Sequence, residues 1–195
     1  MARLDDLIEF AVEHKMKIGT IRDLIAYRRK HDRMMKRIGE RKLVSELGGE
    51  WKAIAFLNAS TGEETLALVK GEIDPAKPTL VRMHLLSIMH DVFAEASDRT
   101  RLVEKSMEMI GEAGCGVIVM INRFVNDYVS RALIPSTDPV RRDIARSLEL
   151  RDYGGGAQIL AELDVHDMIL LTNAPQSLVA LEGYGLSIVE QRPIC

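Results

Sequence analysis

The feature that most constrains this chain is a short apolar run, GVIVMI, at residues 116–121. Its high content of β-branched side chains predicts a buried strand rather than a helix. Hydrophobic residues make up 47% of the 195 residues, which is enough to build a core around such a strand. No apolar run approaches the ~20 residues that a membrane span needs. We therefore expect a globular chain that contains a sheet and does not cross a membrane.

Further strands and helices are predicted on both sides of this run. Residues 51–57 and 65–70 surround a polar loop and predict an antiparallel hairpin, after a turn at Gly48–Gly49. A strand at 80–86 and a helix at 96–112 follow. The closing part alternates helix and strand, at 157–163, 168–171, 176–181 and 186–190. A strand–helix–strand unit beside a hairpin indicates an α+β (mixed α/β) fold.

The chain begins with a predicted helical leader. Leu4, Leu7, Ile8 and Ala11 recur at helical spacing, so helix is expected over residues 4–29, with a break at Gly19–Thr20. A basic run at residues 28–42 follows. It could bind phosphate or an acidic partner, or it could be a solvated helix face or interdomain linker. We expect residues 1–42 to be leader and linker, and residues 43–195 to be the main domain.

Charge and cysteine content exclude several classes of function. The net charge of −3 gives no global basic surface for nucleic acid. The first residues lack the continuous apolar segment of a signal peptide. The two cysteines, Cys115 and Cys195, have no partner at metal-ligand spacing, and a disulfide framework is not expected. A reducing cytoplasm is therefore the expected location.

Three stretches of the sequence resemble one family. Residues 66–93 (LALVKGEIDPAKPTLVRMHLLSIMHDVF) are similar to a segment that runs from "ALVKGDI" to "VRVHSECLTGDVF". Residues 112–121 are similar to "EEGRGVVVYLR", and residues 148–194 resemble the closing region of the same family. The family is GTP cyclohydrolase II of riboflavin biosynthesis. The resemblance implies a GTP cyclohydrolase II-like α+β domain that forms a homodimer.

The leader carries a second resemblance. Residues 5–29 are similar to the final helices of 3,4-dihydroxy-2-butanone 4-phosphate synthase. In many bacteria that synthase is fused in front of cyclohydrolase II. The resemblance therefore implies a synthase domain as partner. The acidic active-site motifs of the synthase are absent from this chain, so the chain alone is not expected to make the butanone phosphate.

The resemblance also implies which residues would hold a metal. The family binds a catalytic zinc through three cysteines in a C-x10-C-x-C pattern. The matching positions here are Ser87, Asp98 and Thr100. Neutral hydroxyls are poor ligands for a borderline-soft ion, so we expect no zinc cofactor. A harder site made of His84, His90, Asp91 and Asp98 is the alternative; otherwise His84 lies at a strand end and the acids are solvated.

The nucleotide-binding positions that the resemblance implies are only partly kept. Arg82, His84 and Thr172 match the family, whereas Leu85 and Leu86 replace a serine and a glutamate, and Ser177 replaces a phosphate-binding lysine. The family's "RQEGRGIGL" segment has no counterpart after Met120. Because charge-assisted bonds to phosphate are lost with these groups, GTP is a doubtful ligand, and whether any nucleotide binds stays open.

Two residues match the family's catalytic aspartate and arginine, namely Glu149 and Arg151. Glu149 places its carboxylate one methylene further out, and catalytic geometry tolerates only about 0.5 Å. A surface ion pair is the alternative interpretation of both residues. The nearby Gly154–Gly156 run could cradle a phosphate, but without a following lysine it is better interpreted as a loop-to-helix connection.

Three functions remain open on these grounds. The first is a non-catalytic cyclohydrolase-like domain that stabilises or regulates the synthase. The second is an enzyme that still opens the ring of GTP or a related nucleotide through a remodelled site. The third is a sensor of a nucleotide or flavin-pathway metabolite. The combined loss of metal ligands, phosphate motif and lysine favours the first.

Overall fold

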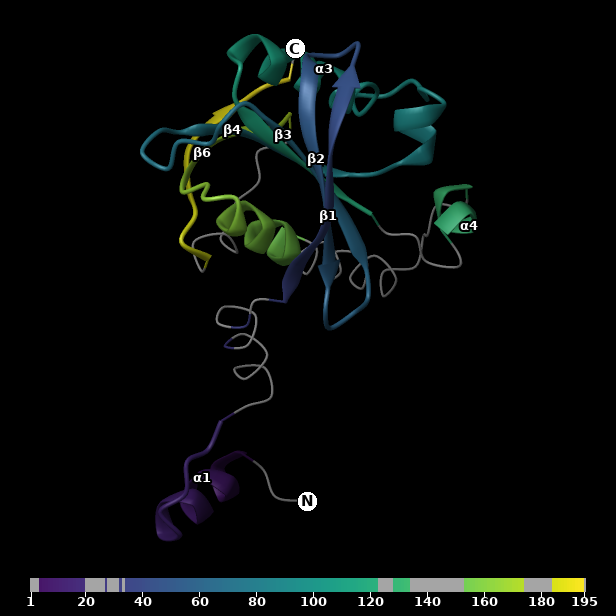
Figure 1. Ribbon diagram of the computed structural model, residues 1–195. Coiled ribbons are helices and arrows are strands. Elements are labelled where there is room, and N and C mark those ends of the chain that lie inside the picture. Colours follow the sequence, from purple (N-terminus) through teal and green to yellow (C-terminus); the bar gives the residue numbers. More distant parts are fainter. Residues whose placement is uncertain are drawn as a thin grey trace. The chain divides into compact units, whose positions relative to one another are not determined.

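Figure 1 shows the computed structural model of the chain, which describes residues 4–19, 27, 32, 34–122, 128–133, 153–173 and 184–194. The chain divides into two compact units, Met1–Arg33 and Met34–Cys195. This division falls earlier than the boundary expected at residue 42, because residues 35–45 pair into the sheet of the second unit. No helix within these ranges is long and apolar enough to cross a membrane.

The first unit contains α1, Leu4–Glu13. The expected helix over residues 4–29 is wrong in extent, because the backbone leaves the helix after Glu13. Lys15 takes a left-handed φ of 53°, and Met16 N–H donates to the Ala11 carbonyl at 2.8 Å. This bond pattern ends a helix in the way glycine usually does. The second leader helix, expected from residue 21, falls outside the described residues apart from Tyr27.

The second unit is built on one sheet, which has seven strands in the part of the chain that the structure describes, in the order β1-β2-β3-β5-β4-β6-β7. Their bounds are β1 Met35–Ser45, β2 Gly49–Asn58, β3 Glu64–Lys70, β4 Thr79–Leu85, β5 Gly116–Ile121, β6 Asp167–Leu171 and β7 Ser187–Arg192. The β1, β2, β3 and β5 strands pair antiparallel, whereas β4 pairs in parallel with β5 and β6, and β6 with β7. The mixed sheet confirms the predicted α+β (mixed α/β) class.

The strand β1 replaces part of the expected basic linker. Lys36 to Lys42 belong to an edge strand of the sheet, so neither a helix face nor a linker describes them. Its basic side chains meet acids on the surface: Arg37 Nη1 lies 3.1 Å from Glu40, and Lys42 Nζ lies 2.5 Å from Glu50. Glu40 also pairs with Lys52 of β2, at 3.3 Å. Because exposed ion pairs of this kind are largely screened by solvent, this part of the run presents no concentrated positive field.

Helices cover both faces of the sheet (Figure 1). The helix at residues 153–162 packs Ala157 and Leu160 against Val81 and Val119 on one face. On the other face, α3 (Leu102–Ala113) packs Ile110 against Ile118 within a second apolar cluster. The buried strand predicted from GVIVMI is confirmed as β5, whose residues contribute to both clusters.

Two close approaches, one to a backbone and one to a side chain, explain conspicuous glycines. A Cβ on Gly111 of α3 would lie 2.5 Å from the Cα of Gly48, so the β1–β2 turn rests directly on the helix. A Cβ on Gly156 would overlap the Met83 side chain. The glycine run 154–156 therefore lies within the described helix and lets it approach the sheet, rather than forming a loop before it.

The helix expected at residues 96–112 begins later, at Leu102. Hydrogen bonds within residues 95–100 and a left-handed φ of 59° at Arg101 keep this segment out of the helix. The alternation of apolar and charged residues at 124–147, with prolines at 135 and 139, predicts helix, loop and helix; of this segment the structure describes only α4, Tyr128–Leu133.

Candidate functional site

The three nucleotide-binding positions expected from the sequence come together at one edge of the parallel strands. Arg82 and His84 lie on β4, and Thr172 directly follows β6. The Arg82 Nη1 atom donates to the carbonyl of Leu171, next to Thr172, at 2.9 Å. The carboxyl ends of parallel strands are where α/β sheets usually bind ligands. This edge is therefore the candidate functional site.

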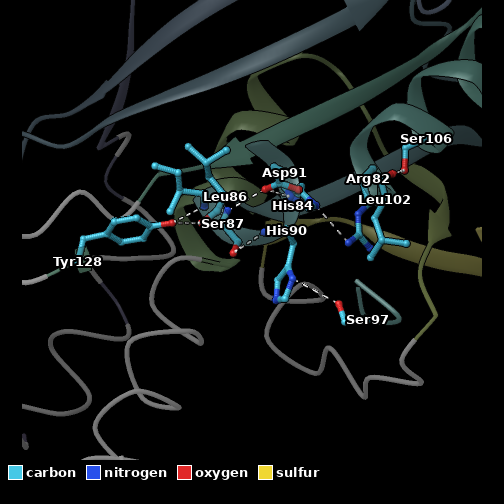
Figure 2. A network of polar contacts seen from close by, with 11 residues as sticks. Arg82, His84, Leu86, Ser87, His90, Asp91, Ser97, Leu102, Ser106 and Tyr128 are labelled. Atoms are coloured by element: carbon cyan, nitrogen blue, oxygen red, sulfur yellow. Dashed lines mark hydrogen bonds and ion pairs between the residues drawn. The ribbon is translucent and has the colours of Figure 1, made fainter. Parts of the chain in front are cut away.

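A buried chain of polar contacts connects β4 to the segment after it (Figure 2). Arg82 Nη2 lies 3.3 Å from His84 Nδ1, and His84 Nε2 lies 2.8 Å from Asp91 Oδ2. Asp91 belongs to η1, one turn of π-helix at Ile88–Val92, and the same oxygen accepts the Ser87 N–H at 2.7 Å. The contacts thus run from a cation, through an imidazole, to a carboxylate.

The environment of Asp91 keeps its carboxyl ionised. Burial is the largest single influence and raises its pKa, but the hydrogen bonds from His84 and the Ser87 N–H, together with electrostatic attraction to His84 and Arg99, hold that pKa below its usual value. Since the carboxylate only accepts, His84 donates through Nε2 and can accept from Arg82 at Nδ1.

This arrangement corrects one sequence interpretation. The acids near His84 were expected to be solvated, yet the side chains of His84 and Asp91 are only 4% and 8% exposed. The sequence did not predict that η1 turns Asp91 back onto β4. Asp98 does remain exposed.

Two atoms in this network are buried without a hydrogen-bond partner among the described residues, Arg82 Nε and Asp91 Oδ1. Burial also lowers the pKa of Arg82 from its usual value. Buried polar atoms are normally paired with protein or water, so each marks a place where a small polar molecule would be stabilised.

The positions matched to the family's zinc ligands hold no metal-binding set. The Ser87 side chain caps η1 by accepting the His90 N–H, and Thr100 Oγ1 accepts the Ser97 N–H at 3.0 Å. The expected alternative set is split. His84 pairs with Asp91, whereas His90 faces Ser97 and Glu95.

Within the described ranges, no three His, Cys, Asp or Glu side chains are placed to hold a metal ion. Hydroxyls replace thiolates at two of the three matched positions, and the third is an exposed carboxylate. The donor set therefore does not fit the family's zinc.

The remaining candidate residues lie partly outside the part of the chain that the structure describes. Glu149 and Arg151 lie outside the described residues, as do Ser177 and the helix expected at 176–181. Asn173, two residues after β6, accepts the Ile194 N–H at 2.7 Å and so attaches the segment after β7 to the end of β6. Tyr128 of α4 was not predicted to contribute, but its hydroxyl accepts the Ile88 N–H at 2.8 Å. No pattern around Tyr128 indicates this long-range contact.

A hollow of about 370 Å³ lies elsewhere, on the strands β1 to β3. Its lining includes Glu40, Lys42, Glu50 and Lys52, whose charges already pair with one another. It shares no lining residue with the Arg82 network.

Comparisons with known proteins agree with the sequence resemblance. The family model described as GTP cyclohydrolase II matches residues 36–193. The riboflavin biosynthesis protein RibBA of Aquifex aeolicus is 39% identical over the whole chain, which covers 50% of that protein. The monofunctional riboflavin biosynthesis protein RIBA 2 of Arabidopsis thaliana is 37% identical, and the chain covers 41% of it.

A solved structure resembles the chain over 98% of its length, with 32% identity and a TM-score of 0.64. It is RibBX of A. baumannii, a two-domain 3,4-dihydroxy-2-butanone 4-phosphate synthase, of which the chain covers 49%. The chain thus spans about half the length of the relatives that it matches.

Proposed function

The chain belongs to the GTP cyclohydrolase II family, and from that membership we propose that it is a non-catalytic family domain of riboflavin biosynthesis. In this proposal it acts in the cytoplasm as the structural or regulatory partner of a 3,4-dihydroxy-2-butanone 4-phosphate synthase domain. The observation that carries the proposal is the metal position. Ser87, Asp98 and Thr100 stand where the resemblance places the three zinc thiolates.

The arrangement of Arg82 supports the same conclusion. Its two terminal nitrogens contact Leu171 and His84, and Asp91 places a negative charge at the far side of His84. A phosphate would have to replace these contacts and approach an ionised carboxylate. The cation that the family would offer to a nucleotide is here largely engaged inside the protein.

The relatives favour the synthase as the partner. RibBX, which resembles the chain over nearly its full length, is described as a two-domain synthase. The leader of this chain is covered by that similarity, since it extends over 98% of the chain. In RibBA and RibBX the region that matches this chain makes up about half of the protein, and the other half is a further segment of similar length. This supports a domain that works beside a second domain.

Formate release tests the proposal, because ring opening of GTP liberates formate. The full chain is incubated with GTP and added zinc, and formate is measured against a heat-killed sample, with an active GTP cyclohydrolase II as the positive control. We expect no formate above the heat-killed level. Formate that disappears in Arg151→Ala would show a remodelled ring-opening enzyme and would overturn the proposal.

A second candidate, a sensor of a nucleotide or flavin-pathway metabolite, is favoured by one observation. Arg82 Nε and Asp91 Oδ1 are buried without hydrogen-bond partners in the described structure, and a polar ligand that reached either atom would pair with it. A ligand that binds only the folded state raises the melting temperature. Thermal unfolding with GTP or flavin mononucleotide would support a sensor if the rise vanished in Arg82→Ala.

We also propose a homodimer, as the family resemblance implies. Leu85 and Leu86 replace polar positions of the family's site, which makes this edge of the domain more apolar. Exposed apolar patches of a few hundred Å² commonly mark interfaces. Light scattering at micromolar concentration is expected to give twice the monomer mass, and a monomeric mass would contradict the dimer.

A further inference from the structure

The segment from Ser87 to Thr100 has almost no apolar packing of its own. None of the residues of η1 is fully buried, and residues 92–99 are all exposed, including Phe93 at 68%. A segment with so little buried apolar surface opens easily unless polar contacts hold it. In the family, a zinc bound at the positions of Ser87, Asp98 and Thr100 would link the two ends of this segment; here other contacts must do so.

Each end of the segment is a tight polar turn. At the first, the Ser87 side chain accepts the His90 N–H, and the buried Asp91 carboxylate accepts the Ser87 N–H. At the second, Ser97 N–H donates to Thr100 Oγ1 at 3.0 Å, and the Thr100 hydroxyl donates to the Glu95 carbonyl. The two turns contain all three positions matched to zinc ligands: Ser87 lies in the first turn, and Asp98 and Thr100 lie in the second.

His90 is the side chain that connects the two turns. Its Nδ1 lies 3.3 Å from Ser97 Oγ and 3.6 Å from a Glu95 carboxylate oxygen, and its side chain is 19% exposed. Figure 2 shows the His90 ring directed away from the His84–Asp91 pair and toward Ser97. In the family segment that residues 81–93 resemble, glycine stands at this position and could make no such contact.

We propose that His90 and Ser97 form a metal-free clasp that holds η1 against the 95–100 turn, across the positions where the family's zinc ligands would lie. The inference rests on the proposed loss of zinc. The η1 turn, which carries His90, is itself fixed to β4, because the buried Asp91 carboxylate contacts His84 and accepts the Ser87 N–H. The hydrogen bond between His90 and Ser97 then acts beside the backbone bond from the Glu95 N–H to the Met89 carbonyl, and together they take the place of a metal as the link between the two turns.

Hydrogen exchange of the backbone amides in the full chain tests the clasp. We expect His90→Ala to accelerate exchange at residues 88–100 by roughly three- to tenfold, the effect of losing one hydrogen bond. Ser97→Ala should accelerate it at least as much, because Ser97 Oγ also accepts the Arg99 N–H at 3.1 Å. Because the two side chains act together, the double variant should exchange no faster than the faster single variant. The β5 amides of residues 117–119 serve as an internal reference for global opening, and His166→Ala, at an exposed histidine, is the matched control.

The outcomes separate this inference from the proposed function. Unchanged exchange in His90→Ala, or additive effects in the double variant, would overturn the clasp and leave the proposed function untouched. Faster exchange of the unmodified chain with 1,10-phenanthroline would show that a bound metal holds the segment, which overturns the clasp and the proposed loss of zinc together. Formate release from GTP then decides separately whether the domain is catalytic.

Discussion

The imidazole of His84 lies between two opposite charges, with Asp91 Oδ2 2.8 Å from its Nε2 and Arg82 Nη2 3.3 Å from its Nδ1. Because the ring and the carboxylate are both buried, this contact fixes η1 to β4 at a point where no apolar packing does so. Arg82 and His84, which match family positions, therefore connect β4 to the end of β6 and to η1.

The first prediction concerns the acid stability of this connection. The pKa of Asp91 is lower in the folded chain than usual, so its stabilisation is fully present above the ordinary carboxyl pKa near ~4 and is lost as pH falls through the lower folded value. Asp91→Asn is expected to cost about 1.5–3 kcal/mol at pH 7, the range for a hydrogen bond to a charged group, and less at pH 3. Urea unfolding at both pH values measures this.

Asp98→Asn is the matched control for that experiment, because Asp98 is exposed and close in sequence. Its stability is expected to equal that of the unmodified chain at both pH values. A cost of Asp91→Asn that is the same at pH 3 as at pH 7 would mean that the ionised carboxylate is not what stabilises the contact.

The second prediction is that the purified chain carries no stoichiometric zinc. The reason is that two hydroxyls and an exposed carboxylate stand at the matched ligand positions. Elemental analysis after dialysis against metal-free buffer measures the content. About one zinc per chain, lost in His84→Ala or Asp98→Ala, would instead reveal a metal site of harder ligands.

The third prediction concerns the apolar face of the leader. Leu7 and Ile8 of α1 are exposed in the described structure, and an amphipathic helix buries such a face against a partner. Removing residues 1–30 is expected to weaken co-purification with the synthase while the second unit, which has its own core, stays folded. Pull-down and circular dichroism measure the two results.

A milder variant refines that test. The double substitution Leu7→Ser and Ile8→Ser is expected to weaken the association as the deletion does, whereas Glu9→Gln, at an exposed charge on the same helix, should not. Unfolding of the truncated chain would show that the leader belongs to the core of this domain, and the partner role would lose its main support.

The fourth prediction is that replacing Gly111 of α3 by alanine destabilises the chain, although glycine-to-alanine changes inside helices usually stabilise. Replacing an interior helix glycine by alanine normally stabilises by about 0.5–1 kcal/mol. At Gly111 the new Cβ would lie 2.5 Å from the Gly48 backbone, which cannot rotate away. Gly111→Ala is therefore expected to destabilise by about 1–3 kcal/mol, the usual range for overpacking.

Gly39→Ala on β1 is its control, since a Cβ there meets nothing within 4 Å. Thermal unfolding of both variants gives the comparison. Gly111→Ala that is as stable as the unmodified chain would show that the β1–β2 turn can move off α3.

The strands with a clear apolar pattern could be predicted from the sequence, and those without one could not. GVIVMI is apolar throughout, because β5 is buried on both faces, and this signal is local. The strand β1 is exposed over most of its length, so its sequence shows charges rather than alternation. Its extended shape comes from pairing with β2, which no local pattern reveals.

The residues of the candidate site also fall into those that could be predicted from the sequence and those that could not. Arg82, His84 and Thr172 could be placed together because the resemblance and the parallel strands both point to one edge. The contacts of Asp91 and His90 could not be predicted, because they depend on the π-helical turn of η1. A shift of one residue in that turn would point the Asp91 and His90 side chains in other directions. Nothing in the sequence IMHDV specifies a π-helical turn rather than an α-helical one.

The strand order β3-β5-β4 has a consequence for how the chain acquires its structure. The β4 strand is synthesised before β5 but lies beyond it in the sheet, so it has no neighbour to pair with until residues 116–121 have arrived. The meander β1 to β3 can assemble early from nearby segments, whereas β4 then waits for β6, almost ninety residues further along. During that interval β4 is paired with β5 on one side only, and its other edge stays unpaired on the nascent chain, a condition that favours aggregation or binding by a chaperone.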